Sequence, residues 1–493
     1  MSLDGIEVPS LGPVAEPYSD RSSVAHNATW LTAAMFAARA CTFALAIFMG
    51  RDLGVTAYGR YGFAVALGTI IVPLADLGVT PYVSREVARD RARGEARSVY
   101  LLQIKIRTAL GALAACAAAA ALLSGQPDAA AVIVVVLASM LADGVSAFVY
   151  GYFQGREQMR FEARSTALAA LVRGLGGIAC VVAFGDLLPV VVWMLAVSCV
   201  QLAVALRRFA VTVDWSHMRR LAASFGVSWG RVWALGSTTL FALIYLQADS
   251  VILGVVYSKY VVGLYTAAYA LTAGLQIIPW QIAIAIAPVF ARRYAGDPAG
   301  FRETWHRGLR IVLMVSLPFS LVTSLLAGDI VTLLFGPLFR PGATALAILV
   351  WSSPVWATNM VVAGALRGAR RDSWLAATTG FGVILNLGLN AWAIPAFGLD
   401  GAAAVTVGTE VAVLLAQGWL AVSRQVAPLP RLPYFRLTLA LAALSVVAIA
   451  VRQVEVVVAA SAALCAYAIA LVATGVVSRA ELEGLRSLAS RSR

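Results

Sequence analysis

The sequence predicts an all-α polytopic membrane protein with about 14 transmembrane helices: two six-helix lobes related by a pseudo-two-fold axis, and two further helices at the C-terminus. Of the 493 residues, 60% are hydrophobic and only 13% are charged, whereas soluble domains are about 45–50% apolar and about 25% charged. Apolar runs of about 20 residues recur, each long enough to cross ~30 Å of hydrocarbon as a helix. Two short motifs also recur at equivalent points of the two halves. This composition excludes most nucleic-acid-binding proteins, whose basic patches lie on soluble folds.

The elements follow in order along the chain. A polar segment at 1–27 lacks the apolar core of a signal peptide, and we expect it to be retained as a cytoplasmic tail. The spans are predicted at 28–50, 60–83, 99–123, 130–153, 165–184, 189–206, 224–247, 263–290, 308–331, 345–366, 373–394, 401–423, 435–451 and 456–477. They define an N-lobe at 28–206, a cytoplasmic linker at 207–223, a C-lobe at 224–423, helices 13 and 14 at 435–477, and a cytoplasmic tail at 478–493. The loops are too short for a soluble catalytic domain, so we predict that the chain is not an enzyme.

The distribution of basic residues predicts the orientation. The net charge is +13, and 26 of the 38 Lys and Arg residues fall in the tails and in the alternate loops on the side of the N-terminus. Only four fall in loops on the other side: Arg51, Lys259, Arg340 and Arg452. Because cytoplasmic loops carry the excess of Lys and Arg in membrane proteins, both termini are expected in the cytoplasm.

An internal repeat predicts the arrangement of the two lobes. The segment LGVTAYGRY at 53–61 resembles LGVVYSKYVVGLY at 253–265, which has four extra residues. Gly155 and Gly185 are thirty residues apart. A second pair of glycines with the same spacing, Gly368 and Gly398, occurs 213 residues further along the chain. The repeats are therefore parallel and related by an axis along the membrane normal, as in secondary transporters that bind substrate between two halves.

Four segments together resemble polysaccharide-export flippases of the Wzx type. LGVTAYGRYGFAVALGTIIVPLADLGVTPYVSREVARDR is similar to the first loop and second helix of that family, and QADSVILGVVYSKYVVGLYTAAYAL to its seventh helix and the following loop. AGDIVTLLFGPLFRPGATALAIL and NLGLNAWAIPAFGLDGAAAVT are similar to its ninth-to-tenth and eleventh-to-twelfth helices. The four segments occur in the same order as in the family, and the resemblance covers nearly all of residues 28–423. The family belongs to the multidrug/oligosaccharidyl-lipid/polysaccharide superfamily, with multidrug extruders and lipid II flippases.

The resemblance implies a function. An oligosaccharide on a polyprenyl pyrophosphate would move from the inner to the outer leaflet of a bacterial inner (plasma) membrane, by alternating access through a basic central cavity. The implied partners are this lipid-linked oligosaccharide, membrane lipid, a polysaccharide polymerase and glycosyltransferases; the product, whether O-antigen, capsule or exopolysaccharide, stays open. The alternatives are a lipid II flippase and a cation-coupled multidrug extruder, although the extruders commonly carry an acidic residue in the first helix, where this chain has Arg39.

Charged residues inside the spans are the candidates for function, because each costs at least ~2.5–3.5 kcal/mol at the bilayer centre. Arginine grips phosphate oxygens bidentately, so a basic cavity suits a pyrophosphate. Lys105 is about 200° from Arg107 on their helix, so we expect it to reach for the interface instead. The candidates for substrate binding are Arg39, Arg107, Arg173 and Arg231.

Each candidate also has a structural interpretation. The carboxylates Asp76, Asp143, Asp249 and Glu410 are candidates for ion coupling or for charge pairs, and Arg39 could pair with Asp76 or Asp143. Arg173 could equally pair with Asp143. Asn386 and Asn390 are four residues apart on one helical face, where they would contact sugar or hydrogen-bond another helix. No metal or cofactor is predicted, because the three histidines are scattered in a tail and loops and the five cysteines lie in apolar runs.

Overall fold

A computed structural model describes residues 21–123, 127–213, 226–294, 296–451 and 453–476. Residues 1–20 of the tail predicted at 1–27, the tail predicted at 478–493 and most of the predicted linker lie outside these residues, and 21–27 belong to the first helix. Within them the chain is helical throughout, which confirms the predicted fold class. The helices are α1 Arg21–Asp76, α2 Val79–Arg89, α3 Arg91–Leu123, α4 Pro127–Gly155, α5 Met159–Phe184, α6 Leu187–Thr212, α8 Trp229–Val256, α9 Lys259–Tyr294, α10 Pro298–Leu325, α11 Ala327–Phe335, η1 Pro337–Gly342, α12 Ala343–Leu349, α13 Ser352–Gly368, α14 Asp372–Ser423, α15 Tyr434–Ala450 and α16 Val456–Ala473.

Eleven segments in the described residues are long and apolar enough to cross a membrane. Two of them, α1 and α14, each consist of two helices that meet at a kink with non-helical backbone, at Gly54 (φ 82°) and Gly398 (φ 62°), and each corresponds to two predicted spans. Positive φ is readily adopted only by glycine, so these two residues mark the loops that the sequence predicted there. The shorter apolar helix α15 corresponds to the thirteenth span. The chain is therefore a multi-pass membrane protein with the predicted succession of spans.

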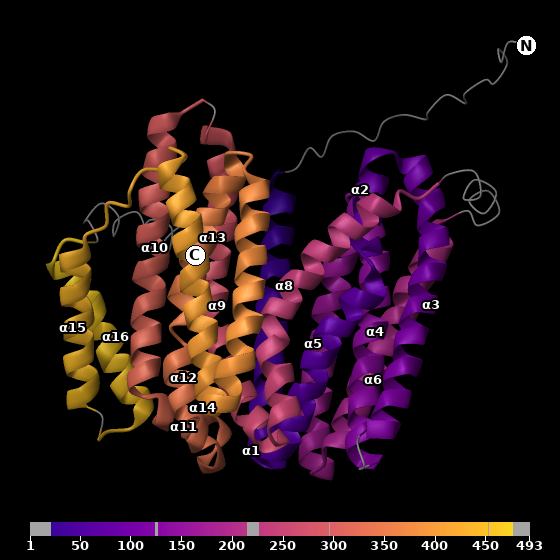
Figure 1. The fold of residues 1–493 in the computed structure, drawn as a ribbon, viewed down its shortest axis with the longest axis horizontal. Helices are drawn as coiled ribbons and strands as arrows, with labels where there is room; N and C mark the ends of the chain where they lie inside the picture. Colours follow the sequence, from indigo (N-terminus) through magenta and orange to yellow (C-terminus); the bar gives the residue numbers. More distant parts are fainter. Residues whose placement is uncertain (1–20, 124–126, 214–225, 295, 452, 477–493) are drawn as a thin grey trace, which may run out of the picture.

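The helices form two groups joined by α1 and α8 (Figure 1). The helices α2–α6 lie on one side and α9–α14 on the other, and α8 crosses obliquely between them. Helix α1 packs against α4 and α5 of the first group and against α8 and α9 of the second. The pair α15 and α16 packs on α10 at the outer edge of the second group.

The backbone reproduces the sequence repeat closely. After α4, the amide of Glu157 (φ 62°) donates to the carbonyl of Gln154 at 2.9 Å. After α13, the amide of Arg370 (φ 56°) donates to the carbonyl of Arg367, also at 2.9 Å. Both pairs are related by the offset of 213 residues, although only the glycine that precedes each turn is shared. The two halves therefore repeat the same turn with different side chains.

Local signals explain where individual helices begin and end. Gly185 closes α5 in the left-handed conformation, and the Asp186 carboxylate then accepts the amide of Leu187 at the start of α6. Asp297 caps α10 in the same way at 2.8 Å from the amide of Gly300, with Pro298 in the first turn. These caps use the polar residues that separate the apolar runs.

Candidate functional site

The first group of helices holds a buried ion pair between α1 and α3. The Lys105 ammonium lies 2.5 Å from an Asp76 carboxylate oxygen, and Lys105 is only 2% exposed. Thr80 donates its hydroxyl to the same carboxylate at 2.5 Å. The expectation that Lys105 reaches for the interface was wrong, because burial beside a carboxylate satisfies its charge within the helix bundle. Arg107 is instead exposed on α3, the helix that lies at the outer edge of the group (Figure 1).

Removing one member of this pair should destabilise the protein more than removing both. Lys105→Met leaves Asp76 charged and unpaired, which typically costs ~3–5 kcal/mol in a buried site. The double variant Lys105→Met/Asp76→Asn leaves no net buried charge and should recover part of this loss. Thermal unfolding of the purified proteins in detergent measures the difference; equal midpoints for the single and double variants would contradict it.

A second pair joins α4 and α5. The Arg173 guanidinium donates to an Asp143 carboxylate oxygen at 3.0 Å and to the Ser198 hydroxyl of α6 at 2.8 Å. The Ser198 hydroxyl also lies 2.9 Å from that of Ser139. The structure thus pairs Arg173 with Asp143, which is the predicted alternative to substrate binding by Arg173. Neither Ser139 nor Ser198 was a candidate, because a single serine in an apolar span carries no signal in the sequence.

Of the four candidate arginines, only Arg173 forms a salt bridge within the part of the chain that the structure describes. Arg39 on α1 and Arg231 on α8 are both exposed, as is Arg107. The helices of Arg39 and Arg231 pack against each other where the two groups meet. Asp76 and Asp143, which were considered as partners of Arg39, are instead bound by Lys105 and Arg173.

The second group of helices holds a network of hydrogen-bonded polar side chains around α14. Glu410 accepts the amide of Asn359, from α13, at 2.9 Å. Asn386 donates to Thr409 across the bend of α14 at 3.3 Å, and Asn390 donates to Asn386 at 3.0 Å. All three candidates in this network are buried, with Asn390 fully so. Asn359 was missed, although it is a lone amide in an apolar span.

Asp249 lies in the same group, near the end of α8. Its carboxylate accepts the hydroxyl of Tyr265 at 2.5 Å and that of Thr406 at 3.2 Å, and it is 2% exposed. Three helices, α8, α9 and α14, therefore meet at this one carboxylate. Its position just after the predicted seventh span, in the segment that resembles the seventh helix of the flippase family, is the signal that pointed to it.

At one end of the bundle the repeat motifs of the two groups cross in close backbone contact. A Cβ atom on Gly59 would overlap the Lys259 carbonyl oxygen and lie 2.7 Å from the Gly263 nitrogen. A Cβ atom on Gly263 would overlap the carbonyl oxygen of Val55. The crossing is symmetric, since Val55 precedes Gly59 by the same four residues by which Lys259 precedes Gly263. Only glycine allows the two backbones to approach so closely.

An aromatic cluster seals the same end. Tyr58, from α1, packs against Phe335 of α11 and Phe339 of η1, with ring centroids 5.7 and 6.1 Å away. All three rings are almost fully buried. This end of the bundle is predicted to be extracellular, because the basic loops lie at the other end. The described structure is therefore closed between the halves at that end.

These features define a class of membrane transporter built from two repeated halves. Residues 24–293, more than half of the chain, match the family described as Polysaccharide biosynthesis protein, and residues 235–392 match the family MatE. The chain belongs to the polysaccharide biosynthesis protein family, within the superfamily that it resembles in sequence. Its class is that of transporters and not of enzymes.

Individual relatives agree with this assignment. The chain is 28% identical over 203 residues to "Probable flippase AglR" from Haloferax volcanii; the match covers 40% of the chain and spans only 42% of that relative. Among solved structures, the fold is similar to "Lipid II flippase MurJ, inward closed conformation", with a TM-score of 0.70 at 12% identity, covering 90% of the chain and 98% of the other. It is also similar to an inward-facing multidrug resistance MATE family transporter, with a TM-score of 0.62 at 16% identity, covering 78% and 94%.

Proposed function

We propose that the protein is a flippase that carries a polyprenyl-pyrophosphate-linked oligosaccharide across a bacterial inner membrane for surface polysaccharide export, with both termini in the cytoplasm. The relevant basic residues are Arg39 and Arg231. A polysaccharide polymerase and glycosyltransferases would act after and before this step. The family description and the relative named as a probable flippase support a saccharide-lipid cargo.

One observation carries the proposal: Arg39 and Arg231, on the two helices between the halves, form no salt bridge with any described residue. Lys105 and Arg173 already bind the intramembrane carboxylates of the first group, so Arg39 and Arg231 are left on the two inter-half helices. An unpaired guanidinium within a membrane is costly, and a bound anion relieves that cost. Phosphate oxygens accept two parallel hydrogen bonds from one guanidinium, which makes a pyrophosphate a suitable anion.

The crossing at Gly59 and Gly263 supports alternating access. It closes one end between the halves, so the pyrophosphate would enter from the opposite, cytoplasmic end and leave after the crossing separates. A cation-coupled drug extruder fits less well, since residues 28–50 contain Arg39 and no carboxylate. Lipid II also carries a pyrophosphate, and remains the alternative cargo because the charge argument applies equally to it.

Reconstitution tests the cargo directly. The full-length protein is placed in vesicles with a polyprenyl-diphosphate oligosaccharide that carries a fluorophore on the sugar, and an impermeant reductant bleaches the outer leaflet. We expect the inner-leaflet fluorescence to become accessible only with protein present. Fluorescent lipid II and a fluorescent organic cation are the comparators. Transport of lipid II alone would favour the alternative cargo, and transport of the cation alone would refute a flippase.

The same vesicles test coupling. Glu410 is the buried carboxylate whose hydrogen bonds join α13 and α14, and we propose it as an ion-coupling residue. If it couples transport to an ion, an imposed proton or sodium gradient accelerates flipping in the wild type and not in Glu410→Gln. An unchanged response in Glu410→Gln would reject this role and assign ion coupling to another residue, whereas a wild type that responds to neither gradient would leave the membrane potential as the driving force.

A further inference from the structure

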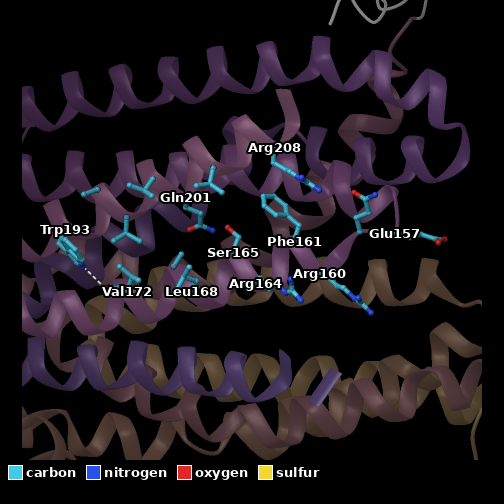
Figure 2. Close-up of a pocket in the computed structure, with 16 residues that line it drawn as sticks. Glu157, Arg160, Phe161, Arg164, Ser165, Leu168, Val172, Trp193, Gln201 and Arg208 are labelled. Atoms are coloured by element: carbon cyan, nitrogen blue, oxygen red, sulfur yellow. Dashed lines mark hydrogen bonds between the residues drawn. The ribbon is translucent and has the colours of Figure 1, made fainter. Parts of the chain in front are cut away.

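A groove of about 1090 Å³ runs between α5 and α6, away from the meeting of the two halves (Figure 2). One wall comes from α5 and the other from α6, and none of its lining residues belongs to α1, α8 or α9. Neither Arg39 nor Arg231 contributes to it. The groove is therefore distinct from the region where we place the transported cargo.

The middle of the groove is apolar and open. Leu168 on α5 and Val200 on α6 line it and are 64% and 65% exposed. In a bilayer, side chains exposed at this depth contact lipid hydrocarbon, so a lipid chain can enter the groove from the side. The far end is closed, because the Trp193 indole of α6 donates to the Val172 carbonyl of α5 at 3.1 Å (Figure 2).

The other end of the groove is basic. Arg160 and Arg164 on α5 and Arg208 on α6 gather there, with Glu157 as the single acidic lining residue (Figure 2). Arg164 and Arg208 are exposed, and neither has a salt bridge to any described residue. Three arginines against one glutamate leave an excess of positive charge at the mouth.

Polar groups continue just inside this mouth. Gln201 donates to the Tyr150 hydroxyl at 3.1 Å, and that hydroxyl lies 2.8 Å from the Ser165 hydroxyl. Gln201 and Ser165 both line the groove. The groove thus changes from charged, through polar, to apolar along its axis, which is the order of a phospholipid's headgroup, glycerol esters and acyl chain.

The length of the groove fits one leaflet. Arg208 and Trp193 are fifteen positions apart on α6, about 22 Å along the helix at ~1.5 Å per residue. Half of the hydrocarbon core is ~15 Å, and the headgroup region adds several ångströms. A polyprenyl chain long enough to cross a whole bilayer would overrun the closed end at Trp193.

We propose that this groove is a binding site for an anionic glycerophospholipid of the leaflet that the basic loops face. Its phosphate lies between Arg164 and Arg208, where guanidinium groups donate to its oxygens, and one acyl chain lies between α5 and α6 toward Trp193. The bound lipid is a resident of the membrane and not the transported cargo, so this proposal stands apart from the proposed function.

Native mass spectrometry of the full-length protein, exchanged from detergent into mixtures of phosphatidylglycerol and phosphatidylcholine, tests the site. We expect one phosphatidylglycerol to be retained in preference to phosphatidylcholine. Arg164→Gln/Arg208→Gln should weaken that retention about tenfold or more, because each phosphate contact involves a charge-assisted hydrogen bond. The matched control is Arg207→Gln, which removes an adjacent, exposed arginine that does not line the groove.

A second variant tests the apolar part of the groove without changing its charge. Val200→Trp fills the middle of the groove at an exposed position and leaves every arginine in place, so it should also lower phosphatidylglycerol retention while thermal stability is kept. Equal retention of the two phospholipids would overturn the proposal, as would unchanged retention in Arg164→Gln/Arg208→Gln. Preferential retention of an added polyprenyl phosphate over phosphatidylglycerol would overturn it too, and would assign the groove to the cargo lipid.

Discussion

Arg39→Ala is expected to abolish flipping while the protein remains folded in the membrane. Arg39 is exposed on α1, forms no salt bridge with any described residue, and belongs to a helix that packs against both halves. Two lost charge-assisted hydrogen bonds to phosphate correspond to about a 100-fold loss of cargo affinity. Leaflet-specific bleaching in vesicles measures the flipping rate, and restored surface polysaccharide in a deletion strain measures function in cells.

Arg107→Ala is the informative comparison. It removes the same kind of side chain, but from the exposed face of α3, the helix at the outer edge of the first group. We expect near-normal flipping from this variant. Wild-type flipping by Arg39→Ala, or an equal loss in both variants, would show that Arg39 does not bind the cargo from between the halves.

Gly59→Val should trap the protein with the two halves apart at the Gly59–Gly263 crossing, the end predicted to be extracellular. The new side chain would overlap the Lys259 carbonyl, and a backbone atom on the facing helix cannot rotate away as a side chain does. The halves could then no longer meet at this end, so flipping should fall to the background of protein-free vesicles. Labelling of a cysteine at Tyr58, in a background without the native cysteines, by an impermeant maleimide added outside cells measures the opening.

The control for this variant is Gly388→Val. Gly388 lies in α14, and a Cβ atom there would meet no neighbour within 4 Å. It should flip cargo normally and protect the cysteine at position 58 as the parent does. If Gly59→Val also protected that cysteine and kept its flipping rate, the crossing would have no part in the transport cycle.

Most of the fold could be predicted from the sequence, because hydropathy indicates the membrane spans and the spacing of the glycines indicates the repeated halves. The apolar runs define the spans, and the repeated glycines indicate the repeat. The crossing between the halves was not predicted, nor was the residue at which each short loop turns, which the structure places at Gly54 and Gly398. The position of such a turn depends on local dihedral angles and not on composition.

The candidate site was less accessible to prediction, for a physical reason. The sequence identifies which charges lie in the membrane, but pairing depends on how helices rotate about their axes. Asp76 contacts Lys105 and not Arg39 because of the orientation of α3, which no residue pattern specified. The α5–α6 groove was not foreseen either, because Arg160, Arg164 and Arg208 looked like members of ordinary basic loops.

The crossing of Val55–Gly59 with Lys259–Gly263 has the form of an isologous dimer interface, in which each partner offers the same patch to the other. Here both partners are parts of one polypeptide. A true homodimer must place identical side chains on both sides of its axis, whereas this chain is free to differ between them. It uses that freedom: ion pairs join helices of the first half, and hydrogen-bonded amides, hydroxyls and carboxylates join helices of the second. A symmetric framework thus carries different side-chain chemistry in its two halves.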